Sequence, residues 1–170
     1  MTVQLKIDGV PLSDLEAKSL VQSYDELSDG HSSRRSADGT PIPQCFYIKR
    51  STTISGESWE KPSMEGMQRR TDYEVSCAAP LAVRSASTTI AIPADARPDT
   101  PILAYALVDG AWEETDYYAE AGNLVLTAVE LAAGYKLEYY PLWTMQLVQK
   151  RITHKLSIPG WDWQLDFEET

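Results

Sequence analysis

The residues PILAYALVDGAWEETDYYAEAGNLVLTAVELAAGYKLEYYPLWTMQLV, numbers 101–148, decide the fold class. Ile102–Val108 is an apolar run that ends at Asp109-Gly110, a dipeptide typical of two-residue β-hairpin turns. Further short runs, separated by Gly, Asn or Pro, follow: Ala111–Tyr118, Leu124–Ala128, Tyr135–Tyr140 and Leu142–Val148. Their alternation and their aromatic and β-branched residues favour antiparallel strands. We therefore predict an all-β fold, an antiparallel β-sandwich or barrel-like meander with long irregular loops.

Two further stretches outside this region support one β domain over residues 1–170. Thr2–Val10 alternates apolar and polar residues and ends near Gly9, which predicts a first strand. At the other end, residues 161–170 place Trp161, Trp163, Leu165 and Phe167 on one face, which predicts a C-terminal strand. Between them, Ser13 followed by Glu16 has the spacing of a capping box, so a turn or short helix is expected there.

Residues 28–43 and 57–70 lack any apolar period, and we expect both to be irregular loops. Long loops within a compact domain are commonly functional or disordered. The second loop carries Trp59, Met64 and Met67, which a segment of this length cannot bury by itself. Both loops are therefore expected to contact a partner surface.

The charge and cysteine content exclude several classes of function. The net charge is −10 over 170 residues, so binding to the nucleic-acid backbone is not expected. No apolar stretch is long enough to cross a bilayer, and the first residues do not form a secretory signal. Cys45 and Cys77 could form a disulfide, but two reduced thiols in a protein made in the cytoplasm are favoured.

Motifs for catalysis are missing from the sequence, so we expect no enzyme activity, no cofactor and no metal. There is no nucleophile elbow, phosphate-binding loop or H-E-x-x-H motif. A zinc site would need separate elements to bring together Cys45, Cys77, His31 and His154. The carboxylates Asp109, Glu113, Glu114, Asp116 and Glu120 could mimic a glycosidase pair or bind a cation, but an acidic rim facing solvent or a partner is favoured.

Two other groups of residues have competing interpretations. The basic run Lys150–Lys155 could contact nucleic acid, pair with the acidic hairpin of an adjacent copy, or form a solvated face. Trp161, Trp163, Tyr117 and Tyr118 could form a platform for sugar rings. For the two tryptophans, the buried or interface face of the last strand is the favoured interpretation.

The order of several segments resembles small structural proteins of long, non-contractile tails of bacteriophages (siphophage-like minor tail, tail-tip or baseplate proteins). The residues that carry the resemblance are Leu20–Tyr24, Arg34, Arg35, Ala37–Thr40, Gln44, Lys49, Thr53–Gly56, Trp59, Pro62, Tyr73–Pro80 and the closing Trp161, Trp163, Leu165, Glu168 and Glu169.

The resemblance implies a non-enzymatic subunit of the virion tail, assembled in the host cytoplasm. Its partners would be other copies of itself and other tail or baseplate proteins, without nucleic acid or membrane insertion. The alternatives are a carbohydrate-binding β-sandwich that recognises a cell-surface glycan, and a head–tail connector (neck) component. The candidate interface residues are Arg34, Arg35, Trp59, Met64, Met67, Glu113, Glu114, Lys150, Arg151, Lys155, Trp161 and Trp163.

Overall fold

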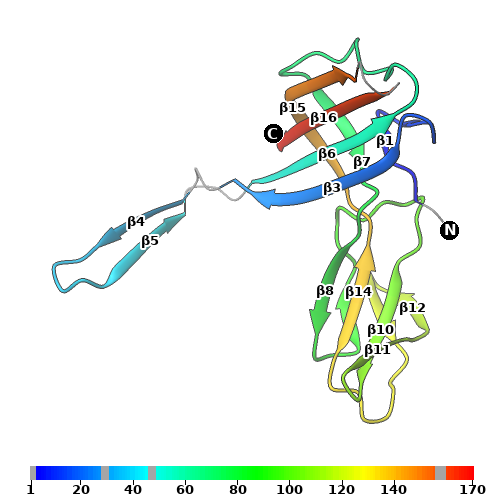
Figure 1. The fold of residues 1–170 in the computed structure, drawn as a ribbon. Coiled ribbons are helices and arrows are strands. Elements are labelled where there is room, and N and C mark those ends of the chain that lie inside the picture. Colours follow the sequence, from blue (N-terminus) through cyan, green and yellow to red (C-terminus); the bar gives the residue numbers. More distant parts are fainter. Residues whose placement is uncertain (1–2, 28–30, 46–48, 156–159) are drawn as a thin grey trace. The chain divides into compact units, whose positions relative to one another are not determined.

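The structure, a computed structural model, describes residues 3–27, 31–45, 49–155 and 160–170 (Figure 1). Every regular element in these residues is a β-strand; the sheets are antiparallel and none closes into a barrel. The predicted all-β, sandwich-like fold class is therefore confirmed. Where the sequence predicted one domain, the chain divides into two compact units: unit 1 contains Met1–Leu5 and Ser76–Trp143, and unit 2 contains Lys6–Val75 and Thr144–Thr170.

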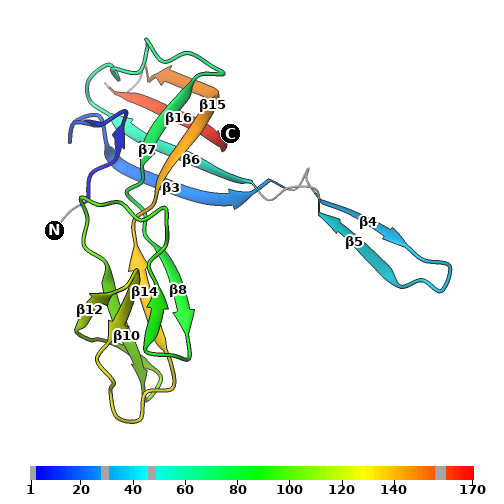
Figure 2. The ribbon, with the colours of Figure 1, turned by 180° about the vertical axis from the view of Figure 1, so that it is seen from behind.

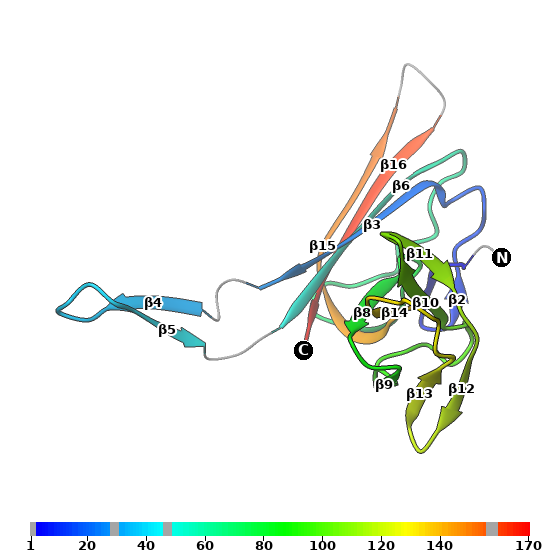
Figure 3. The same ribbon diagram turned by 90° about the horizontal axis from the view of Figure 1, so that it is seen from below.

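Unit 1 is a small β-sandwich whose two sheets face each other (Figure 3). Its core is formed by apolar residues that both sheets contribute: Ile90, Ala104, Ala106, Leu124, Leu126, Tyr135 and Leu137. The four-stranded sheet has the order β11 (Ala111–Glu114), β10 (Leu103–Val108), β14 (Tyr135–Tyr139), β8 (Leu81–Ser85). The three-stranded sheet has the order β12 (Tyr117–Glu120), β13 (Asn123–Leu126), β9 (Thr89–Ala91).

The hairpin turns of unit 1 explain the order of its strands. Asp109 and Gly110 both have positive φ, as a type I′ turn requires, and they join β10 to β11. The predicted strand Ala111–Tyr118 is instead two strands that belong to different sheets. At the break, the amide of Thr115 donates to the carbonyl of Ala104 (2.9 Å), so the chain leaves the first sheet there before it enters the second as β12.

Unit 2 is built on a seven-stranded sheet (Figures 1 and 2). Along three of its strands buried and partly exposed residues alternate, so one face is apolar and the other polar. The strands have the order β2 (Val10–Pro11), β1 (Lys6–Ile7), β7 (Asp72–Ser76), β15 (Leu142–His154), β16 (Trp161–Glu169), β6 (Arg50–Ser58), β3 (Lys18–Glu26). The expected first strand Thr2–Val10 is shorter than predicted, because its described part turns at Asp8 and Gly9 between β1 and β2.

Much of the expected loop 28–43 forms a β-hairpin of its own, β4 (His31–Arg35) and β5 (Pro41–Cys45). The amide of Ser36 donates to the carbonyl of Thr40 (3.0 Å) and closes the turn. The polar sequence gave no apolar alternation, so these strands could not be predicted. Pro41 and Pro43 are two residues apart, so their nitrogens share one strand edge, and β5 still pairs with β4 along the other edge.

The segment 57–70 begins with the end of β6, and residues 59–71 contain turns and bends but no strand. The predicted capping box is present as a turn. The hydroxyl and the amide of Ser13 both donate to the Glu16 carboxylate (3.1 and 3.3 Å), and the amide of Glu16 donates to the Ser13 hydroxyl (3.2 Å). No helix follows, because β3 begins at Lys18.

The turn between β12 and β13 offers a test of this description. Ala121 has φ 48°, a left-handed conformation that costs a non-glycine residue about 1–2 kcal/mol and that asparagine tolerates better. We expect Ala121→Asn to raise the free energy of unfolding by about 0.5–1 kcal/mol in urea titrations. Ala119→Asn, in the regular part of β12, is the control and should give no gain; an equal gain there would contradict the turn geometry.

Candidate functional site

Trp163 belongs to the core of unit 2 and is not available as a surface platform. Its side chain is 2% exposed, and its indole Nε1 donates to the main-chain carbonyl of Glu16 (2.7 Å). Trp163 lies opposite Gly56 on β6, where a Cβ atom would be only 2.8 Å from Trp163 Cζ2. Gly56 is therefore needed for the indole to lie across β6.

The carboxylate of Glu16 closes the turn that begins at Ser13, and it also connects this turn to the segment 59–70. In addition to its bonds with Ser13, it accepts a hydrogen bond from the amide of Ser63 through Oε1 (2.7 Å). Partial burial raises the pKa of Glu16, but the hydrogen bonds from Ser63 and Ser13 outweigh this effect, so its pKa lies below the ordinary value.

Lys150 fastens the same segment to the sheet. Its ammonium group donates to the carbonyls of Met64 (3.1 Å), Glu65 (2.9 Å) and Met67 (2.8 Å), which uses the three donors of a lysine. A bulge between Leu147 and Gln149 turns Lys150 to the buried face, where it pairs with Leu165 of β16.

Lys150 and Met64 are therefore structural residues and do not form the expected interface. Met64 is 2% exposed, and Met67 is half-buried beside it. The predicted basic patch Lys150–Lys155 does not form as one surface either, because the strand directs Lys150 inward while Arg151 is exposed. The inward position of Lys150 is hard to predict from the sequence, because no distinctive residue marks the bulge that reverses the inward and outward alternation of β15.

The end of the β15–β16 hairpin gathers three of the expected interface residues. Lys155 forms ion pairs with Glu57 (3.1 Å) and Asp162 (2.8 Å); hydrogen bonds to these carboxylates raise its pKa. The ring of Trp161 lies 4.5 Å from that of His154, between centroids. Trp59 is 58% exposed, and the ammonium of Lys18 lies 4.4 Å from the centroid of its ring.

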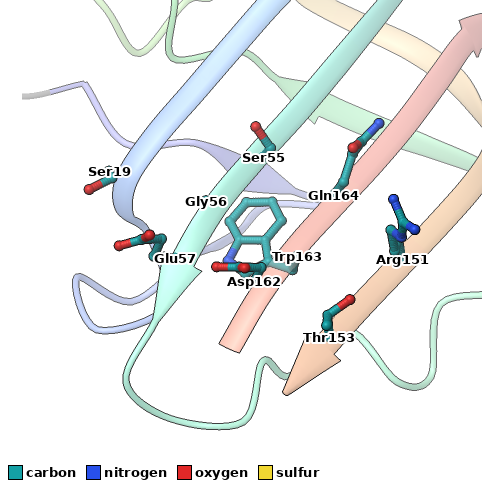
Figure 4. Close-up of a pocket in the computed structure, with 9 residues that line it drawn as sticks. All are labelled: Ser19, Ser55, Gly56, Glu57, Arg151, Thr153, Asp162, Trp163 and Gln164. Carbon is teal, nitrogen blue, oxygen red and sulfur yellow. The ribbon is translucent and has the colours of Figure 1, made fainter. Parts of the chain in front are cut away.

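The polar face of the sheet in unit 2 carries an open pocket of about 560 Å³ (Figure 4). We call the residues that line this face along the strands the outer sheet face: Ser51, Thr53 and Ser55 of β6, Arg151 of β15, and Asp162, Gln164, Asp166 and Glu168 of β16. All are half-buried or exposed. The pocket is lined by Ser19, Ser55, Gly56, Glu57, Arg151, Thr153, Asp162, Trp163 and Gln164.

The carboxylates near the pocket differ in their partners. Glu57 and Asp162, which line the pocket, both form ion pairs with Lys155. Elsewhere on the outer sheet face, Gln164 donates through Nε2 to both oxygens of Asp166 (2.9 and 3.2 Å). Within the described chain, neither Asp166 nor Glu168 has a basic partner.

The arginines of the β4–β5 hairpin are exposed. Arg35 donates to the carbonyl of Gly39 in the adjacent turn (3.0 Å), while Arg34 has no ion-pair partner among the described residues. The side chains of His31 and Cys45 lie outside the described residues, and Cys77 is fully buried. No group of His, Cys, Asp and Glu able to hold a metal occurs within the part of the chain that is described.

In unit 1, Glu113 and Glu114 are exposed on β11, as an acidic rim would be. Beside them lies an aromatic and cationic cluster that sequence reasoning missed. The ammonium of Lys136 lies 4.5 Å from the ring centroid of Tyr105 and 5.0 Å from that of Trp112. Lys136 also forms an ion pair with Glu138 (2.6 Å), so its ammonium group has an acidic partner within the same sheet.

The tyrosines considered as a sugar platform lie on β12. Tyr118 is 58% exposed, whereas Tyr117 is 38% exposed and donates through its hydroxyl to the carbonyl of Ile102 (2.8 Å). Trp163, which belongs to unit 2, is buried and offers no exposed ring face for a sugar.

No family model and no curated protein sequence matches this chain. The described residues include no helix of the length and apolar character needed to span a membrane.

The contact between Gly56 and Trp163 gives a prediction with a matched control. Gly56→Ala should lower the free energy of unfolding by about 1–3 kcal/mol, because the added methyl group would overlap the indole. Gly66→Ala is the control: no atom lies within 4 Å of its Cβ position, so it should change stability little. Urea denaturation followed by tryptophan fluorescence measures the free energy of unfolding of both variants. Equal losses would contradict the expected overlap between the added methyl group and the indole.

The Glu16 carboxylate gives a prediction for pH. Its folded-state pKa is lowered, so the bond to Ser63 is fully present above the ordinary value of 4.5 and is lost as the pH falls through the folded-state value. We expect the exchange protection of the Ser63 amide, corrected for intrinsic rate, to fall over this range. The variant Glu16→Gln should abolish that pH dependence; an unchanged pH profile in the variant would assign the effect to another group.

Proposed function

We propose that this chain is a non-enzymatic structural subunit of a bacteriophage tail, which docks into a ring with other proteins of the tail tip or baseplate. The β4–β5 hairpin is the observation that carries the proposal. It forms a two-stranded sheet of its own, and every side chain of residues 37–42 is exposed. An isolated two-stranded hairpin is marginally stable in water, so a partner surface would stabilise it.

The outer sheet face also supports an assembling subunit. It is a polar face on three neighbouring strands. Two of its carboxylates, Asp166 and Glu168, have no ion-pair partner among the basic side chains of the described residues. Subunits that form rings through heterologous contacts need two complementary surfaces, and this chain offers an arm and a face. The resemblance of its sequence to tail proteins of long-tailed bacteriophages is the reason to propose a phage tail as that assembly.

A carbohydrate-binding module is less favoured by the geometry. Of the four aromatic residues considered for it, Trp163 lies in the core and the ring of Trp161 lies against that of His154 at a tilt of 41°. A head–tail connector component would use the same kinds of surface, so location within the particle separates it from a tail-tip subunit. A hydrolase on the acidic hairpin would need Glu113 and Glu114 in a cleft, yet both lie exposed on a strand.

The proposal is tested by quantitative mass spectrometry of purified phage particles from a culture that produces this chain. We expect the chain in the particles at a small multiple of three or six copies per tail, scaled to the major tail subunit. Tails separated from heads should retain it, whereas a neck component would follow the heads when the two are parted at the connector. Its absence from intact particles, with known tail proteins detected in the same sample, would overturn the proposal.

A further inference from the structure

We infer that the β4–β5 hairpin of one copy of this chain docks on the outer sheet face of a second copy. The inference rests on the proposed role as an assembling subunit and names the surfaces that meet. The partner is therefore another molecule of the same sequence, and the contact is between two different surfaces.

The hairpin presents a cation and an apolar side chain together. Arg34 pairs with Ile42 across the two strands, so both side chains point to the same face of the hairpin. Ile42 is 47% exposed, and Arg34 has no ion-pair partner among the described residues. A surface that suits this face must supply carboxylates and a small apolar contact.

The outer sheet face supplies both. Asp166 and Glu168 on β16 are acidic and without a basic partner in the described chain. Val21 of β3 is 60% exposed and pairs with Ser55, so it lies on this same face. Between β3 and β16, the column Ser51, Thr53 and Ser55 has short side chains, which would let a two-stranded ribbon approach the sheet closely.

Charge favours a second copy as the partner. A chain with a net charge of −10 repels its own copies over most of its surface, so association needs a local basic element. The hairpin has adjacent arginines, Arg34 and Arg35, with Asp38 as the one carboxylate between Arg34 and Ile42. Opposite charges at such a contact would fix its register, and a heterologous contact of this kind builds rings or filaments.

The test uses two double variants of the full chain in analytical ultracentrifugation. The arm variant is Arg34→Glu with Arg35→Glu, and the face variant is Asp166→Asn with Glu168→Gln, which removes the two charges without creating a basic face that the acidic arm could bind. We expect the wild type to associate with increasing concentration, and each variant to associate at least about tenfold more weakly. High salt should weaken the wild-type association, because the charges are exposed.

A mixture of the two variants decides between this contact and any other. The arm variant keeps an intact face, and the face variant keeps an intact arm, so an equimolar mixture should form one-to-one dimers and nothing larger. The controls are Arg69→Glu, and Asp14→Asn with Glu130→Gln, at exposed positions that belong to neither surface. These should associate like the wild type, and circular dichroism should show all variants folded.

Three results would overturn the inference: a wild type that stays monomeric at every concentration, variants that associate normally, or a mixture that fails to recover dimers. A hairpin that folds back on its own sheet would give the first result. These outcomes are separable from the proposed function, because the particle analysis scores the presence of the chain in tails whatever surface holds it there.

Discussion

The indole of Trp163 lying across Gly56 is the contact on which unit 2 depends. It joins two central strands of the sheet at van der Waals distance and, through its bond to the Glu16 carbonyl, fixes the turn that precedes β3. Glu16 in turn holds the amide of Ser63, and Lys150 holds the carbonyls that follow it. The apolar face of the sheet is thus covered by an irregular segment that is tied down through its own main chain, which leaves the polar face open for interaction.

Unit 1 reaches stability by a different route. Its two sheets bury a shared apolar core, and the chain that enters them is organised by Arg97, which is 4% exposed. The guanidinium donates to both carboxylate oxygens of Asp99 and to the carbonyls of Gln4 and Cys77. A buried arginine is tolerated when its donors are used in this way, and here it joins three separate segments of unit 1.

Short sequence patterns predicted the turns and strand faces whose conformation is set by residues close together in the chain. Asp109-Gly110 predicted a hairpin because that dipeptide adopts positive φ readily, and the alternation of Trp163, Leu165 and Phe167 predicted the buried face of β16. The β4–β5 hairpin could not be predicted, because its described side chains at Arg34, Arg35, Pro41 and Ile42 are exposed and such strands need no apolar period. The inward position of Lys150 depends on a bulge, and the interior position of Met64 depends on segments distant in sequence, so neither left a local pattern.

The larger part of unit 1, Ser76–Trp143, lies between the two parts of unit 2 in the sequence, and this division has a consequence for synthesis on the ribosome. The strands of unit 1 follow one another closely along the chain, so the sandwich has all its residues before the sheet of unit 2 does. In that sheet, β6 is translated early but pairs with β16, the last strand of the chain. Until β16 is translated, the apolar residues of β6 lack that neighbour, and the nascent chain carries an unfinished sheet edge. Loss of the codons for residues 161–169 would remove the strand between β15 and β6, so unit 2 can be completed only once these residues have been translated.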